Sequence, residues 1–91
     1  MLTGETIRAI RRVRNVPQIK LAQQAGIPQP YISQIEQNSR IITQEQETAI
    51  LAALNVTEQQ SEELTTIVRH ITDARKIEET GWAKIRQALQ S

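Results

Sequence analysis

The sequence predicts an all-α protein with a single domain. Aliphatic residues recur at every third or fourth position along most of its 91 residues, whereas no segment shows strand alternation or a hairpin turn. Residue types that begin and end helices flank these segments. Phenylalanine is absent, and there is one tyrosine and one tryptophan. The core must therefore be built from Ile, Leu, Val and Ala, which suits packed helices.

The first helix is expected over residues 4–14. Thr3 is a candidate N-cap, because its hydroxyl can accept a hydrogen bond from a free backbone N–H of the first turn. Leu2 and Ile7 stand at the two positions of a hydrophobic staple around it. Asn15 can adopt the left-handed conformation that ends a helix.

Two short helices are expected next, over residues 18–25 and from residue 29 to about residue 37. Gly26 lies between them and permits a positive φ, so the chain can turn sharply there. The second of these helices is expected to bury Ile32 and Ile35. Prolines fall at or near the starts of both helices, where the missing N–H costs little: Pro17, Pro28 and Pro30.

Two copies of the pattern T-x-x-Q predict the starts of the next two helices. The first copy, Thr43–Gln46, opens a helix that is expected to run to Leu54 and to end at Asn55. The second, Thr57–Gln60, opens another helix. Asn38 is expected to close the helix that precedes both. The inward residues of the helix after the first pattern are expected to be Ala49, Ile50, Ala53 and Leu54.

The C-terminal part carries an apolar stripe that keeps one helical phase, consisting of Leu64, Ile67, Val68, Ile71, Trp82, Ile85 and Leu89. Arg75 and Glu78 interrupt the stripe, and Gly81 is a weak helix breaker. The sequence leaves open one long helix or two helices broken at Gly81. The common phase favours a continuous or gently kinked rod.

The net charge of +1 hides an uneven distribution. Residues 1–40 hold six Lys and Arg against two acids, and residues 41–91 hold five against eight. The basic half is expected to attract polyanions, unless it is only an unevenly charged solvated surface. Absence of cysteine excludes disulfides and thiolate metal sites, and neither a membrane-length apolar run nor a signal-peptide pattern is found. A cytoplasmic protein with no membrane contact is expected.

A tight glycine turn between two short helices is the geometry of a helix-turn-helix, whose second helix can enter the major groove of DNA. Gln29 and Gln34 are expected on one side of this second helix, with Ile32 and Ile35 toward the core. Its polar surface then consists mainly of amides and a hydroxyl, which match base edges. Each glutamine could also be an ordinary solvated side chain.

The pattern L-A-x-x-x-G-I-x-x-x-x-I-S-x-I-E, from Leu21 to Glu36, resembles the helix-turn-helix of the phage-repressor-like family (Cro/cI type, also called the Xre family). The resemblance extends from about Gly4 to Ile71. It implies an all-α, five-helix phage-repressor-like DNA-binding domain over residues 1–71. Residues 72–91 have no counterpart in the minimal domain and are interpreted as an additional C-terminal helix.

The resemblance also implies roles for individual residues. The expected base contacts lie on the second helix of the motif: Gln29, Pro30, Tyr31, Ser33 and Gln34. The expected phosphate contacts lie before and after it: Gln18, Gln37, Asn38 and Arg40. Arg11 and Glu36 match an ion pair that ties the first helix to the third. Pro17 and Pro28 replace the capping Ser or Thr of the family, so the starts of two helices are expected to lack side-chain caps.

The implied function is sequence-specific binding of double-stranded DNA by a transcription regulator. It is expected to be a dimeric repressor that binds a palindromic operator and occludes a promoter. The alternative is an antitoxin or an accessory protein of a plasmid or mobile element, whose acidic C-terminal half binds a partner protein. An enzyme is not expected, because no nucleophile with a base is visible. No cofactor is expected, and His70 with Asp73 offers too few ligands for a metal.

Residues 72–91 are expected to be the dimerisation element, through Trp82, Ile85 and Leu89. A monomer would leave this stripe exposed or fold it back on itself. Pairing with the stripe or the preceding helix of a second subunit would bury it symmetrically.

Overall fold

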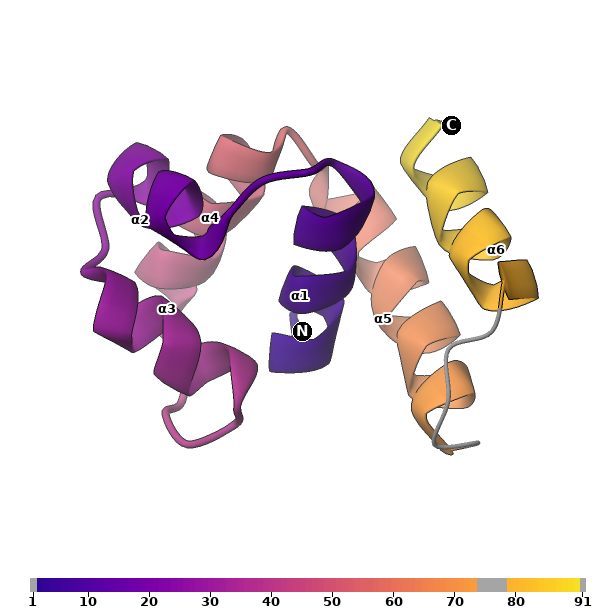
Figure 1. Ribbon diagram of the computed structural model, residues 1–91, viewed down its shortest axis with the longest axis horizontal. Helices are drawn as coiled ribbons and strands as arrows, with labels where there is room; N and C mark the ends of the chain where they lie inside the picture. Colours follow the sequence, from indigo (N-terminus) through magenta and orange to yellow (C-terminus); the bar gives the residue numbers. More distant parts are fainter. Residues whose placement is uncertain (1, 74–78, 91) are drawn as a thin grey trace.

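A computed structural model of the chain describes residues 2–73 and 79–90, and it describes side chains up to residue 70 and from residue 83 to 90. The described residues form helices joined by short loops, with no strand among them (Figure 1). The predicted all-α class is confirmed. The helices are α1 (Gly4–Val13), α2 (Gln18–Ala25), α3 (Gln29–Glu36), α4 (Gln44–Leu54), α5 (Glu58–Asp73) and α6 (Glu79–Gln90).

The first four helices begin and end within one residue of the predicted positions. The Thr3 hydroxyl accepts a hydrogen bond from the backbone N–H of Thr6, and Thr43 and Gln46 form the predicted capping box. The starts of α2 and α3, at Pro17 and Pro28, carry no side-chain cap, also as predicted.

Four helices end in the same way. A residue with a positive φ follows the helix, and the next N–H bonds to the carbonyl five residues back, which is the Schellman motif. The residues with positive φ are Asn15, Gly26, Asn38 and Asn55, and the bonds run from Val16 to Arg11, Ile27 to Ala22, Ser39 to Gln34 and Val56 to Leu51. These turns are tight, so each helix reverses directly onto its neighbour.

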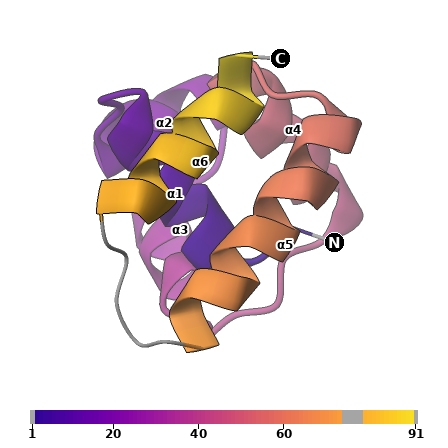
Figure 2. The same cartoon turned by 90° about the vertical axis from the view of Figure 1, so that its right-hand side faces the viewer.

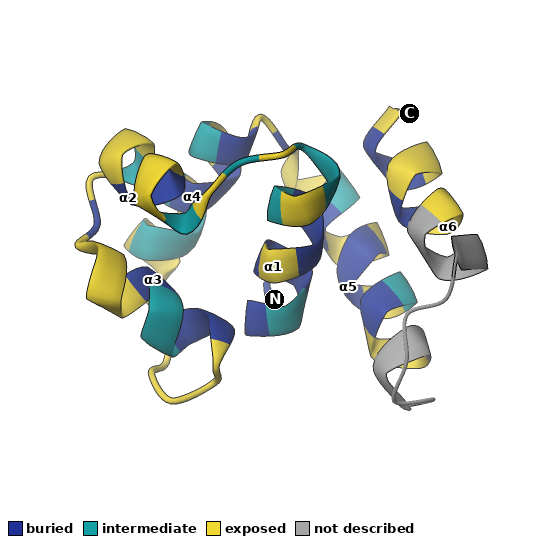
Figure 3. Cartoon of the chain, viewed as in Figure 1, coloured by how far each residue is buried: buried dark blue, intermediate teal, exposed yellow. Residues whose placement is uncertain are grey.

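Helix α1 lies in the middle of the molecule, with α2, α3 and α4 on one side and α5 and α6 on the other (Figures 1 and 2). Its buried residues face α3 and α5 (Figure 3). The fully buried aliphatic side chains come from every helix and include Ile7, Ile10, Leu21, Ile32, Ile50, Leu64 and Ile85. On α4, Ile50 and Leu54 are buried as predicted, but Leu51 is buried too, while Ala49 and Ala53 are only partly covered.

The sequence left open one long helix or two at the C-terminus, and the continuous rod that the common phase favoured is wrong. Helices α5 and α6 are separate and pack side by side in opposite directions (Figure 2). The break does not fall at Gly81, which lies inside α6; α5 ends at Asp73 and α6 begins at Glu79. Gln60 links the start of α5 to the end of α6. Its Oε1 accepts a hydrogen bond from the N–H of Thr57, and its Nε2 lies 3.4 Å from the carbonyl oxygen of Leu89.

The apolar side of α6 is covered by the chain itself. Ile85 is fully buried, and Ala88 and Leu89 are buried with it in the same core as α1 and α5. A single chain was expected either to leave the stripe exposed or to fold it back on itself, and the described residues of the stripe show the second outcome. The Trp82 side chain lies outside the described side chains, as does Ile71, and Arg75 and Glu78 lie outside the described residues.

Candidate nucleic-acid interface

The predicted helix-turn-helix is formed by α2, the turn at Gly26, and α3. Gly26 has a φ of 69°, which an L side chain rarely adopts, and Ile27 directly after it is buried. Ile32 and Ile35 fasten α3 to the core. Because Ile32, Ile35 and Glu36 face inward, the outward side of α3 is formed by the other positions of the helix.

The outward side of α3 carries the five predicted base contacts. Gln29 and Pro30 are exposed, Tyr31 is 38% exposed, and Ser33 and Gln34 are half-buried. No Asp, Glu, Lys or Arg belongs to this set. The side of the helix that can meet a base edge therefore offers amide, hydroxyl and apolar groups, while its one charged residue, Glu36, is buried.

Glu36 ties α3 to α1 through a two-pronged ion pair with Arg11. Arg11 Nε lies 2.8 Å from Glu36 Oε2, and Arg11 Nη2 lies 3.0 Å from Oε1. The Glu36 side chain has no exposed surface, and that of Arg11 is 16% exposed. A third bond, from Arg11 Nη1 to the carbonyl of Val16, holds the loop before α2. The pair thus joins α1, α3 and the loop between α1 and α2.

The same carboxylate holds Gln18 at the start of α2. Gln18 Nε2 donates to Glu36 Oε1 over 3.0 Å. A carboxylate facing two guanidinium groups only accepts hydrogen bonds, so the amide nitrogen of Gln18 must face it. The Gln18 oxygen consequently points away, and it lies 3.5 Å from Nε2 of Gln29. Gln29 is therefore oriented through a chain of contacts that begins at a buried charge.

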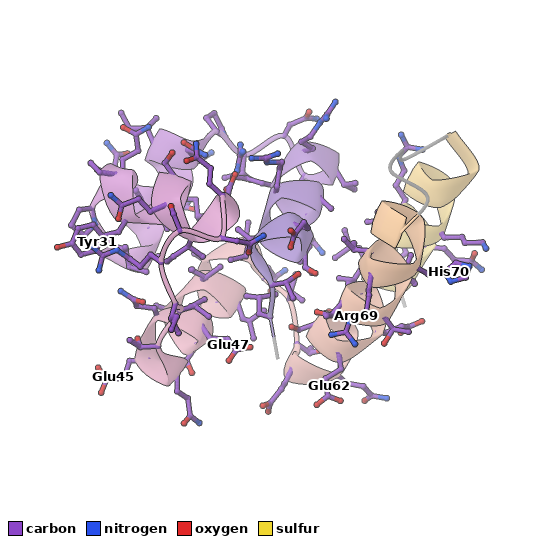
Figure 4. All side chains as sticks on the ribbon, turned by 90° about the horizontal axis from the view of Figure 1, so that it is seen from below. Tyr31, Glu45, Glu47, Glu62, Arg69 and His70 are labelled. Atoms are coloured by element: carbon purple, nitrogen blue, oxygen red, sulfur yellow. The ribbon has the colours of Figure 1, made fainter. Side chains whose placement is uncertain are left out.

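A second cluster joins α3 to the loop that follows it. Arg40 Nε donates to Gln34 Oε1 over 2.7 Å, and the Arg40 guanidinium carbon lies 3.9 Å from the centre of the Tyr31 ring. Tyr31 stands at the edge of the molecule, far from His70 and Arg69 on α5 (Figure 4). This cluster joins two predicted base contacts to one predicted phosphate contact.

The remaining predicted phosphate contacts differ in their surroundings. Gln37 is exposed. Asn38 is exposed too, and its amide donates to Glu5 Oε1 at the start of α1. Gln18 is half-buried, and its nitrogen is engaged by Glu36. For Gln18, therefore, the amide oxygen, which lies 3.5 Å from Gln29 Nε2, is the side-chain atom that Glu36 does not bind.

The sequence did not predict the contacts of three residues in this region. Arg8 Nε lies 3.6 Å from Glu36 Oε1; its place three residues before Arg11, on the same side of a helix, could have indicated this. Ser39 donates its hydroxyl to the carbonyl of Gln34. Gly4 packs directly against the backbone of α3, because a Cβ there would lie 2.2 Å from the carbonyl oxygen of Ile35. Neither Ser39 nor Gly4 carries a sequence signal for these contacts.

Comparison with known families decides the identity of the fold. The family model HTH_3, described as a helix-turn-helix, matches residues 7–60, more than half of the chain. The chain belongs to the HTH_3 helix-turn-helix family. It is accordingly a DNA-binding transcription regulator of the Xre/Cro type, a class of regulators that is typically non-enzymatic.

In two further comparisons, no curated protein and no solved structure matches this helix-turn-helix protein. Its described helices include none that is long and apolar enough to cross a membrane.

Proposed function

We propose that this helix-turn-helix protein is a dimeric repressor that binds a palindromic operator in double-stranded DNA and acts by occluding a promoter in the cytoplasm. The observation that carries the proposal is the outward side of α3, which presents Gln29, Ser33 and Gln34 while Ile32, Ile35 and Glu36 are buried. Amides and hydroxyls match the donor and acceptor pattern of base edges in the major groove.

The residues divide into two roles in this proposal. Gln29 and Gln34 read bases, with Ser33 and Tyr31 beside them, and Pro30 offers apolar contact to a thymine methyl group. Phosphates are bound around this surface by Gln18, Gln37, Asn38 and Arg40. The uncapped backbone N–H groups at the start of α2 add a partial positive charge beside Gln18.

A dimer is supported by the size of the chain. One α3 of eight residues can contact only a few base pairs, so two copies are needed for a specific site. The longest extent of the molecule is 32 Å. Two copies side by side can therefore place their α3 helices in successive major grooves, about 34 Å apart. Ile85 and Leu89 are already covered within one chain. Their part in dimerisation therefore stays a prediction, and it requires that a second subunit displace α6 from its own chain or pack against α6 where it is.

The experiment that tests the proposal is selection of bound duplexes from a random pool. We expect a palindromic motif whose half-sites are separated by about one helical turn. A motif without symmetry would contradict the dimer but not base reading. Equal recovery of all sequences would contradict sequence-specific binding.

An antitoxin or accessory protein remains a second candidate, because the stretch between residues 41 and 68 holds five acids and no Lys or Arg. Four of these acids are exposed on α4 and α5: Glu45, Glu58, Glu62 and Glu63. Such a surface suits a basic partner protein. A neighbouring gene for a small basic toxin, whose product co-purifies with the chain, would favour this candidate.

A further inference from the structure

We propose that Arg40 determines which base Gln34 reads, by holding the amide oxygen of Gln34 and leaving its N–H groups to face the DNA. The proposal rests on the proposed function, in which α3 lies in the major groove. It assigns to Arg40 a part in sequence specificity that differs from phosphate binding.

The orientation of the Gln34 amide follows from the chemistry of its partner. A guanidinium group carries five N–H donors and no acceptor. The atom of Gln34 that lies 2.7 Å from Arg40 Nε must therefore be the oxygen and not the nitrogen. The amide nitrogen is on the other branch of the same planar group, so it points away from Arg40.

Arg40 is itself held in place from two directions. Its guanidinium carbon lies 3.9 Å from the centre of the Tyr31 ring, close enough for a stacked cation–π contact. Tyr31 and Gln34 are three residues apart on α3 and therefore lie on one side of it. The Schellman turn after α3 brings the chain back over that side, since the N–H and the hydroxyl of Ser39 both bond to the carbonyl oxygen of Gln34.

The consequence for base recognition is a bias toward acceptors. A glutamine with both ends of its amide free pairs with adenine, which offers the N7 acceptor and the N6 donor. Gln34 has its oxygen beside a cation, and a base N–H approaching that oxygen would meet the N–H groups of Arg40. Guanine presents two acceptors, N7 and O6, and no donor on this edge. We therefore expect Gln34 to read guanine.

Gln29 provides the contrast within the same helix. Its Nε2 faces the Gln18 oxygen, so its own oxygen and its second N–H stay available for adenine. Two residues of one type thus select different bases because their neighbours orient them differently. The two terminal nitrogens of Arg40 can still contact a phosphate while Nε binds Gln34.

The test uses full-length protein and two measurements. First, the base position read by Gln34 is identified as the one whose preference is lost in Gln34→Ala during selection from a random pool. Second, duplexes with guanine or adenine at that position compete for the wild-type protein, for Arg40→Ala and for Lys20→Ala. Lys20→Ala is the matched control, because it removes one exposed positive charge of the basic half from a different helix, α2.

We expect wild type to bind the guanine duplex about tenfold more tightly than the adenine duplex. Arg40→Ala should bring this ratio close to one and weaken binding to both duplexes. Lys20→Ala should weaken both equally and keep the ratio. Tyr31→Ala should reduce the ratio by releasing Arg40, whereas Tyr31→Phe should keep it because the ring remains.

The contrary outcomes are separable. A preference for adenine in wild type or an unchanged ratio in Arg40→Ala would overturn the role of Arg40 and leave the proposed function standing. If Gln34→Ala affected no position, Gln34 would also be removed from the base-reading residues, while operator binding itself would stand. No enriched motif at all would overturn the proposed function, and this inference with it. In the free protein, absence of nuclear Overhauser effects between Arg40 and the Tyr31 ring would overturn the contact itself.

Discussion

Among the described residues, three nitrogen-bearing side chains surround the Glu36 carboxylate, and they differ in burial. Arg11 and Gln18 bond to it from inside the molecule, whereas Arg8 reaches it from the surface with 53% of its side chain exposed. Removing one partner of a buried pair leaves an uncompensated charge, while exposed pairs contribute little. The same carboxylate therefore allows a direct comparison of the two cases.

We predict that Glu36→Ala and Arg11→Ala each lower the free energy of unfolding by about 3 kcal/mol. Arg8→Ala, the matched control, should cost about 0.5 kcal/mol or less. Urea unfolding of the single variants and of the Arg11 and Glu36 double variant measures these values. If the losses of the two single variants simply add in the double variant, the two residues do not stabilise each other.

Replacing Gly4 by alanine is expected to lower stability, although helix propensity alone would predict a gain. Alanine is favoured over glycine by about 1 kcal/mol in helices. Here the added Cβ would lie 2.2 Å from the Ile35 carbonyl oxygen and 2.9 Å from the Glu36 Cα, and both belong to backbone that cannot rotate away. We expect Gly4→Ala to destabilise the protein by about 1–3 kcal/mol, measured by thermal unfolding. A variant as stable as wild type would mean that α1 and α3 can separate without cost.

At the scale of elements, the ends of the helices were the most predictable feature. Asn15, Gly26, Asn38 and Asn55 have residue types that tolerate positive φ, and each one ends a helix as the sequence predicted. Caps are local, so a few neighbouring residues suffice to specify them. This is why α1 to α4 lie where the sequence placed them.

Asn55, which ends α4 outside the helix-turn-helix, offers a test of this local rule. Asn55→Ala should lower the free energy of unfolding by about 1 kcal/mol, because alanine pays for the left-handed conformation. Asn55→Gly should be close to neutral, since glycine adopts a φ of 57° without strain. Denaturant midpoints of the two variants decide. Equal losses for both would assign the effect to the asparagine side chain instead of its backbone.

The relation between α5 and α6 was not predictable from periodicity. An apolar stripe in one phase fits a continuous rod, and it fits equally well two helices whose apolar sides face each other. Ile85 and Leu89 are buried in the second arrangement. The contacts among Tyr31, Gln34 and Arg40 were not predictable for a related reason. The sequence indicated each residue, but their contacts depend on how the turn after α3 brings the chain back against that helix.

At the scale of the whole molecule, α6 completes a core that α1 and α5 leave open on one side. Ile85→Ala should therefore cost about 2–5 kcal/mol, and the neighbouring exposed Lys84→Ala should cost less than about 0.5 kcal/mol. Because this packing lies within one chain, the loss should not depend on protein concentration. Unfolding at two concentrations, with sedimentation equilibrium alongside, measures both properties. An unfolding midpoint that rises with concentration in wild type and not in Ile85→Ala would instead place Ile85 at a subunit interface.

The single tyrosine and the single tryptophan mark different parts of the fold, and no other aromatic residue except one histidine is present. Tyr31 lies on α3 beneath Arg40, and Trp82 belongs to α6. The unlabelled protein consequently carries two separate intrinsic reporters. Excitation at the long-wavelength edge of the protein absorption band selects the indole, so its emission can follow the detachment of α6, while the nuclear magnetic resonance signals of the Tyr31 ring can follow the arrival of DNA. Local opening of one end of the molecule can thus be timed against events at the other without attaching a dye.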